Sequence, residues 1–139
     1  MVNQQFTFAV HILTVLAFSP GEVIGSQKLA ASVNTNPVVV RRLLLALRGA
    51  ELIETFAGKH GGARLRRKPE RIRLVDVYDA VESRPVIPVN ERKAFKRCDV
   101  SCQMKDIMCT VAESTEQAVR RHLRGITLAQ LVRKVRSRH

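Results

Sequence analysis

The three cysteines of this chain, Cys98, Cys102 and Cys109, lie together in one short stretch, CDVSCQMKDIMC. Thiolates at this density can ligate iron or an iron-sulfur cluster, form a redox-sensitive thiol site, or pack as small apolar side chains on a helix. Cys102 and Cys109 are seven residues apart, so on a helix they share a face but lie about 10.5 Å apart along its axis. Cys98 and Cys102, four residues apart, can approach each other. The spacing leaves all three interpretations open.

The remaining residues that could do chemistry form no recognisable catalytic motif. Four histidines are scattered along the chain, and nothing places one of them beside a cysteine as a base beside its nucleophile. No phosphate-binding loop or pair of catalytic carboxylates is evident. We therefore expect a protein that is not an enzyme. An iron-sulfur cluster is the one cofactor that the cysteines leave open, and their spacing weighs against it.

The charge distribution points to a polyanionic partner. The chain carries 24 Lys and Arg against 12 Asp and Glu, a net charge of +12, and residues 37–73 alone hold ten basic and three acidic residues. With one Tyr, five Phe and no Trp, it is poor in the aromatic platforms that stack single-stranded bases. Double-stranded DNA is the favoured partner, and a basic RNA-binding module is the alternative. No apolar run is long enough for a membrane span and no signal peptide is evident, so we expect a cytoplasmic protein.

The elements that must position these residues follow from the spacing of apolar side chains. It predicts a helix over residues 6–18, a short helix over residues 27–33 with Ser26 as N-cap, and a third helix that Asn36 caps and Pro37 begins. Two short helices joined by the tight turn NTN indicate a helix-turn-helix. The next segment, LIETFAGKHGGARLRR, predicts a β-hairpin, which after a recognition helix is a wing. The predicted fold is mainly α with a small β-hairpin.

Beyond Cys98, apolar residues recur every three or four positions for about twenty residues, which predicts one long helix. Little chain remains to cover its apolar stripe, so we expect the helix to be buried against a copy of itself in a homodimer. We divide the chain into a winged helix-turn-helix DNA-binding domain (residues 1–83), a linker (84–97) and a dimerisation helix with a C-terminal tail (98–139). The residues expected in the dimer contact are Ile107, Val111, Ala118 and Leu123.

The predicted recognition helix would hold Val38, Arg41 and Arg42 against base edges, because arginine binds guanine bidentately and valine can contact a thymine methyl group. Phosphate contacts alone are the alternative for the two arginines, and capping alone is the alternative for Thr35 and Asn36. The other residues expected to hold DNA act on phosphates or in the minor groove; they are Ser26, Gln27, Thr35, Asn36, Lys59, His60, Gly61, Gly62 and Arg64.

This order of elements, the GKHGG wing, the motif IRLVDVYDAVE and a cysteine before a long helix resemble the Rrf2 family of bacterial winged-helix regulators. The stretch SVNTNPVVVRR resembles its YwnA-like branch in particular. The family includes an iron-sulfur cluster regulator, a nitric-oxide-sensitive repressor and a cysteine metabolism repressor. The resemblance implies transcription regulation, a palindromic operator, a crossed homodimer, repression more often than activation, and an effector that the sequence does not identify.

The resemblance also bears on the cysteines. Cluster-binding members carry three cysteines at about this place, often as C-x5-C-x5-C, whereas this chain has C-x3-C-x6-C. Cys98 stands where many members keep a cysteine, and the adjacent Lys96 and Arg97 would favour its thiolate. The implied function is a thiol or redox switch. An iron-sulfur sensor of the same fold, an inert cysteine cluster and regulation through binding another protein are the alternatives.

Overall fold

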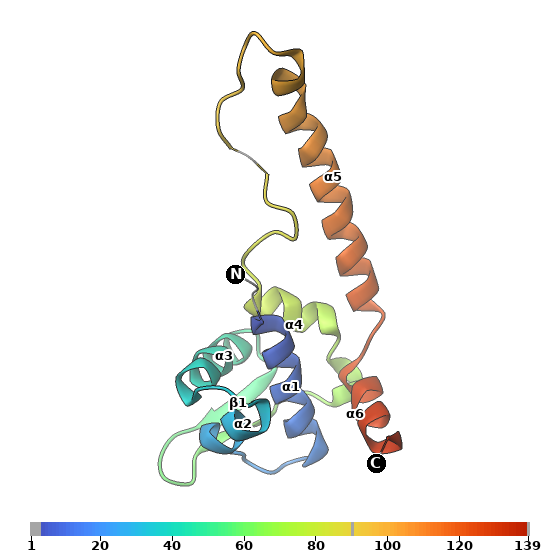
Figure 1. Cartoon of the computed structure of the whole chain (residues 1–139). Helices are drawn as coiled ribbons and strands as arrows, with labels where there is room; N and C mark the ends of the chain where they lie inside the picture. The colour runs from blue at the N-terminus through green and yellow to red at the C-terminus, as the bar shows by residue number, and fades with distance from the viewer. Residues whose placement is uncertain (1–3, 90, 139) are drawn as a thin grey trace. The chain divides into compact units, whose positions relative to one another are not determined.

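The computed structural model describes residues 4–89 and 91–138. Residues 1–3 of the expected DNA-binding domain, residue 90 of the expected linker and residue 139 of the expected tail lie outside the described residues. The described part contains mostly helices and one two-stranded sheet, which confirms the expected fold class (Figure 1). The elements are α1 (Gln5–Phe18), α2 (Ser26–Val33), α3 (Pro37–Gly49), β1 (Ile53–Phe56), β2 (Gly62–Leu65), the short 3-10 helix η1 (Pro69–Arg71), α4 (Leu74–Val81), α5 (Asp99–Arg124) and α6 (Leu128–Ser137).

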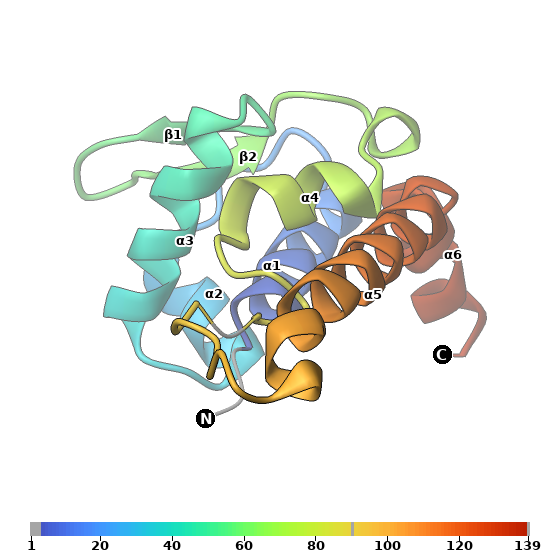
Figure 2. The same cartoon turned by 90° about the horizontal axis from the view of Figure 1, so that it is seen from above.

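The chain divides into two compact units, residues 4–82 with 123–138, called the winged unit, and residues 83–122. The core of the winged unit is built around α1, which contacts α2, α3, α4 and α6 (Figure 2). Ile12 and Leu13 of α1 are fully buried, as are Leu29 of α2 and Leu47 of α3. Each such side chain contributes about 1.5–3 kcal/mol by leaving water. This single core fixes the helix-turn-helix on its support.

The short helix α2 begins differently from the prediction. Ser26 is its first residue, and Gly25 occupies the N-cap position without a side-chain hydrogen bond. The prediction that Ser26 caps the helix is therefore wrong. The extended backbone of Gly25, with φ −72° and ψ 156°, already provides the N-cap conformation, so the helix starts one residue earlier than a serine cap at Ser26 would place it.

The C-terminal helix α6 belongs to the winged unit. Thr127 and Gln130 form a capping box: the Thr127 hydroxyl accepts from the Gln130 N–H at 3.3 Å, and the Gln130 side chain accepts from the Thr127 N–H at 3.1 Å. Leu128 is fully buried, and its N–H donates to the carbonyl of Ile72 at 2.8 Å. In the division expected from the sequence, these residues form the C-terminal tail that follows the dimerisation helix. Their apolar face completes the core beside α1.

The β-hairpin docks on the strand-like segment that precedes α2. β1 and β2 pair antiparallel with Ile53 opposite Leu65 and Phe56 opposite Gly62. An isolated bridge then joins Ala63 to Ile24 through two backbone hydrogen bonds of 2.9 Å. These bonds hold the wing against the start of α2.

In residues 83–122, an irregular segment leads into α5, as the two prolines and mixed charge of the linker predict. The long helix is confirmed, and none of its described residues is buried. Among the helices of residues 4–89 and 91–138, none combines the length and apolarity that crossing a bilayer requires.

Candidate nucleic-acid interface

A tight turn and a capped proline set the start of α3. Asn34 adopts a left-handed conformation, with φ +65°, and closes α2. Asn36 then caps α3, because its Oδ1 accepts a hydrogen bond from the backbone N–H of Val38 at 2.8 Å. Pro37 occupies the first helical position, where its missing N–H costs nothing. The predicted cap is confirmed, and it gives the N-terminal turn of α3 a fixed direction.

The buried and exposed faces of α3 are sharply divided. The stripe of Val40, Leu43, Leu44 and Leu47, which recur at helical spacing, is buried. The opposite face is exposed and consists of Val38, Arg41, Arg42 and Leu45, which recur at the i, i+3, i+4 and i+7 positions of one helix face. Val38 is 51% and Leu45 66% exposed. We call this set the outer face of α3.

Leu45 is a candidate site residue that was not among those predicted from the sequence. It was passed over as one more leucine of the run LLLALR, in which three of the leucines are indeed buried. The available signal was its position seven residues after Val38, which places it on the exposed stripe instead of the core. An exposed leucine beside arginines suits apolar contact with a thymine methyl group.

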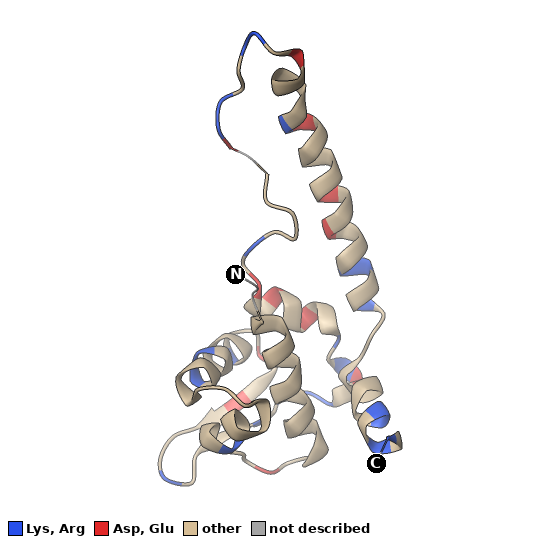
Figure 3. Cartoon of the chain, in the orientation of Figure 1, with Lys and Arg blue, Asp and Glu red and all other residues tan. Residues whose placement is uncertain are grey.

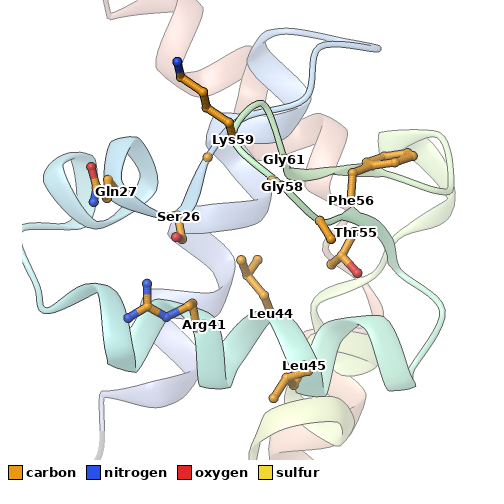
Figure 4. Close-up of a pocket in the computed structure, with 13 residues that line it drawn as sticks. Ser26, Gln27, Arg41, Leu44, Leu45, Thr55, Phe56, Gly58, Lys59 and Gly61 are labelled. Atoms are coloured by element: carbon orange, nitrogen blue, oxygen red, sulfur yellow. The ribbon is translucent and has the colours of Figure 1, made fainter.

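Beside the outer face, α3, the N-terminus of α2 and the hairpin enclose a groove of about 720 Å³ (Figure 4). Arg41 points from α3 toward Ser26 and Gln27 of α2, and Lys59 projects from the hairpin turn above them. The groove therefore gathers six of the predicted site residues from three separate elements; they are Ser26, Gln27, Arg41, Lys59, Gly61 and Gly62. We call it the α3–wing groove.

The other predicted residues lie around this groove without lining it. Val38 and Arg42 are exposed on the outer face of α3, Asn36 is exposed at its cap, and Thr35 is half-buried in the turn before it. His60 is exposed in the hairpin turn next to Lys59.

Arg64 is engaged within the hairpin. Its Nε donates to a carboxylate oxygen of Glu54 at 2.9 Å, and its guanidinium lies 4.9 Å from the centre of the Phe56 ring. Both partners of the ion pair are 42% exposed, so the pair contributes little to stability and can exchange for another anion. A phosphate contact by Arg64 would use its terminal guanidinium N–H groups or displace Glu54 from Nε.

The two glycines of the wing serve the hairpin itself. A Cβ at Gly62, where φ is +151°, would lie 2.2 Å from the carbonyl oxygen of Ile24, and one at Gly61 would lie 2.2 Å from the carbonyl oxygen of Phe56. Both neighbours are backbone atoms, so no side-chain movement could make room. These glycines let the hairpin fold back and dock beside α2.

The electrostatic character of this side of the winged unit is positive. Among the described residues that line the α3–wing groove there are two cations, Arg41 and Lys59, and no acidic side chain. Lys and Arg also mark α3 and α6, whereas the charged residues of α4 are acidic, Asp76 and Asp79 (Figure 3). A convex helix face with arginines, next to a basic loop, presents donors and cations to a polyanion.

The long helix α5 has an uncovered apolar stripe. Val100, Met104, Ile107 and Val111 are each between 40% and 65% exposed and follow a four-three-four spacing along one side. Of the residues predicted to contact a second copy, Ile107, Val111 and Ala118 are exposed, and Leu123 is half-buried. Val100 and Met104, which continue the same spacing toward the start of α5, were not among the predicted contact residues.

The three cysteines do not converge. Cys98 immediately precedes α5 and is half-buried; its Sγ accepts a hydrogen bond from the backbone N–H of Ser101 at 3.4 Å. Cys102 and Cys109 are exposed on a helix that is continuous from Asp99 to Arg124, so they stay about 10.5 Å apart along its axis. Within the described residues, no group of three or more His, Cys, Asp or Glu side chains is placed to hold a metal ion. The thiols of one chain therefore do not fit a three-cysteine iron or iron-sulfur site.

A capped helix-turn-helix, a glycine-docked β-hairpin and a basic outer helix face together define a winged helix-turn-helix regulator. Comparison with known proteins gives the family: the family model described as Rrf2, iron-dependent transcriptional regulator, matches residues 2–134. This chain belongs to the Rrf2 family of transcriptional regulators. The resemblance drawn from the sequence is confirmed, and the class is a regulator and not an enzyme.

Three relatives show how far the similarity reaches. YwnA of Bacillus subtilis (strain 168), described as an HTH-type transcriptional regulator, is 31% identical over 132 residues, which are 95% of this chain and 97% of that protein. A crystal structure described as a DNA-binding protein is 31% identical, with a TM-score of 0.73, and the match covers 91% of this chain and 97% of that one. CymR, the global cysteine regulator of B. subtilis, shares the fold with a TM-score of 0.67 at 20% identity, covering 96% and 97%.

Proposed function

We propose that this protein binds double-stranded DNA sequence-specifically as a homodimer and represses transcription from a palindromic operator. The observation that carries the proposal is the outer face of α3, where Val38, Arg41, Arg42 and Leu45 are exposed beside a basic groove. An α-helix fits the major groove, and a guanidinium reads guanine through two parallel hydrogen bonds. Arg41 and Arg42 read base edges, while Val38 and Leu45 contact thymine methyl groups.

Phosphate contacts fix the position of α3 on the duplex. The first backbone N–H groups of α2, at Ser26 and Gln27, point outward from a helix N-terminus and can bind a phosphate oxygen. Asn36 uses its Oδ1 for the cap, so its amide NH₂ is left to donate to phosphate. Lys59 and His60 at the hairpin turn enter the adjacent minor groove.

The dimer forms through α5. The stripe of Val100, Met104, Ile107 and Val111 has the spacing of a seam between two helices and needs an apolar partner to leave water. A two-fold dimer presents two copies of α3 to half-sites about 34 Å apart, one turn of the duplex. In this arrangement residues 1–83 read DNA and residues 98–124 hold the pair together.

The decisive experiment selects operators from a random duplex library and then measures anisotropy with Arg41→Ala, Arg42→Ala and the control Arg48→Ala. Arg48 is exposed seven residues after Arg41, so it lies on the same side of α3 but two turns further from the N-terminal end that reaches base edges. Each outer-face arginine should contribute about 1–3 kcal/mol, which is roughly a five- to 150-fold loss of affinity, and should relax the sequence preference at one position per half-site. Equal losses in all three variants would show a merely electrostatic contact.

Two further readouts separate DNA reading from RNA binding. Neutralising about six to ten phosphates makes operator affinity fall roughly a thousandfold or more between 50 and 200 mM salt. Structured RNA should bind without discrimination and more weakly than the operator. Comparable affinity for RNA, with no sequence enriched from the DNA library, would favour a basic RNA-binding module instead.

A thiol switch at Cys98 is the second part of the proposal. Its half-buried Sγ accepts from the Ser101 N–H at the start of α5, so oxidation to a sulfenic acid changes the group that caps the dimerisation helix. Hydrogen peroxide supplies the oxygen, and the attacking thiolate releases hydroxide. Cys98→Ser keeps a capping oxygen and should bind operator normally but without sensitivity to peroxide, whereas Cys109→Ser should respond like the wild type. A Cys98→Ser variant that still loses affinity on oxidation rules out this switch.

A further inference from the structure

The winged unit has a second groove, which takes no part in the proposed DNA contact. It has a volume of about 690 Å³ and runs along α1 between α2 and α6, the two helices that flank α1 in Figures 1 and 2. Its floor is apolar and includes Val10, Val15 and Phe18 of α1 with Leu131 and Val135 of α6. Phe18 is 38% and Val135 43% exposed, so two large apolar side chains of this unit lie open in it. We call it the α1 groove.

The rim of the α1 groove is cationic on both sides. Lys28 of α2 faces the groove from one wall, and Lys134 and Arg138 of α6 from the other. No acidic side chain is among the described residues that line it, and none of these three cations has an ion-pair partner within residues 4–89 and 91–138. A fourth cation, Arg136, lies with its guanidinium 4.9 Å from the centre of the Phe18 ring. The groove therefore combines an apolar floor with unneutralised positive charge.

One polar contact closes the α2 side. His11 Nε2 of α1 and the Ser32 hydroxyl of α2 are hydrogen-bonded at 3.0 Å, and both residues line the groove. Because the two groups satisfy each other, they leave the recognition of a ligand to the apolar floor and the basic rim. The volume lies in the range of about 300–1,000 Å³ that is typical of sites for small organic molecules.

We propose that the α1 groove binds a small amphiphilic organic anion, with an aliphatic or aromatic body on the Phe18 and Val135 floor and a carboxylate against Lys28 and Lys134. Charge complementarity selects this occupant. A neutral molecule of the same shape leaves the cations uncompensated, and a cationic one is repelled by both walls.

The site is also placed to influence DNA reading, a consequence that rests on the proposed function. α2 is only eight residues long. Its first residues, Ser26 and Gln27, line the α3–wing groove, while Lys28 and Ser32 line the α1 groove. A ligand held between Lys28 and α6 restrains α2 and thereby the N–H groups offered to phosphate. Such a ligand would act as an effector of operator binding.

The test titrates the full chain with decanoate by isothermal calorimetry, with decanol and decyltrimethylammonium as neutral and cationic probes below their micelle concentrations. Decanoate should bind saturably at one site per chain, and the other two should bind at least tenfold more weakly. Lys28→Glu/Lys134→Glu should weaken decanoate at least tenfold. The control Lys93→Glu/Arg133→Glu makes the same change in net charge at exposed positions outside the groove and should leave binding unchanged.

Several results would overturn the assignment. If decanol bound as tightly as decanoate, or if both double variants weakened decanoate binding equally, the cations of the rim would not contribute to recognition. A smaller assembly for Lys28→Glu/Lys134→Glu in sedimentation would identify the groove as a contact between copies of the chain. Because calorimetry needs no DNA, the site is tested even if the chain has no operator. Coupling is tested separately: decanoate should shift operator affinity at least threefold in the wild type, and no shift would refute the effector role alone.

Discussion

The position of the wing depends on one glycine, and its replacement gives a prediction that can be worked from the structure. At Gly62, φ is +151°, and an added Cβ would lie 2.2 Å from the Ile24 carbonyl oxygen and 2.4 Å from its carbon. Both atoms are backbone, so Gly62→Ala has to separate the hairpin from Ile24. The two hydrogen bonds of 2.9 Å between Ile24 and Ala63 then break.

The expected cost is the sum of two effects. Two backbone hydrogen bonds contribute about 1 kcal/mol each, and a non-glycine residue in this conformation costs about 1 kcal/mol or slightly more. Gly62→Ala should therefore lower the free energy of unfolding by about 3 kcal/mol, out of a total of about 5–15 kcal/mol for a domain. The domain stays folded, but the hairpin no longer docks beside α2.

Two other glycines of the chain serve as controls. Gly58 has φ +96° with open space around its Cβ position, so Gly58→Ala should lower the free energy of unfolding only through backbone strain, by about 1 kcal/mol. Gly49 ends α3 with ordinary φ and open space, so Gly49→Ala should stabilise the protein by about 0.5–1 kcal/mol. The predicted order of stability is Gly49→Ala, wild type, Gly58→Ala, Gly62→Ala.

Urea unfolding followed by circular dichroism at one protein concentration measures this order, since any dimer makes the midpoint depend on concentration. Operator affinity is measured on the same variants. Gly62→Ala should weaken it by more than Gly58→Ala, because the wing and the start of α2 separate. A Gly62→Ala variant within about 0.5 kcal/mol of Gly58→Ala would refute the steric reasoning.

The remaining predictions concern caps and the dimer. Asn36→Ala removes the acceptor for the Val38 N–H. It should lower the free energy of unfolding in urea by about 1 kcal/mol and should also weaken operator binding. An unchanged free energy of unfolding would mean that the cap is dispensable. Thr127→Ala should cost a similar amount by opening the α6 capping box, yet leave operator affinity nearly intact at temperatures where the protein is folded. Ile107→Asp places a charge on the α5 stripe and should shift the sedimentation coefficient toward that of a monomer. Lys105→Asp, at an exposed position nearby, should leave the sedimentation coefficient unchanged. Equal sedimentation of the two variants would show that the stripe is not part of the dimer contact.

The features that the sequence predicted well are local ones. The start of α3 is specified by two adjacent residues, Asn36 and Pro37, and its buried stripe by helical spacing, so both could be predicted without knowledge of the rest of the chain. The same spacing predicted α5. Even Leu45 was predictable in principle, because its exposure follows from its position relative to Val38.

The features that the sequence missed depend on contacts between distant segments. Leu128 and Val132 give α6 an apolar face, but only the folded chain shows that this face packs beside α1 and not against another copy of the protein. Likewise, Gly62 was recognisable as a turn glycine, whereas its close approach to Ile24 follows from a bridge between segments nearly forty residues apart. Serine before a helical pattern favoured a cap at Ser26, yet the extended Gly25 already takes that place.

The surfaces of the winged unit meet at α2, and this constrains how the protein can be regulated. α2 is anchored to the core by the buried Leu29 and Ala30 and the partly buried Val33, while Ser26 and Gln27 line one groove and Lys28 and Ser32 the other. An element this short is held by few core contacts, so its position can shift at a lower free energy than that of the longer core helices. A signal at the α1 groove therefore needs no long pathway to reach the DNA contact, because one helix forms a wall of both. In the proposed dimer, a signal at Cys98 would act differently, through the helix that we propose holds the two copies of the chain together.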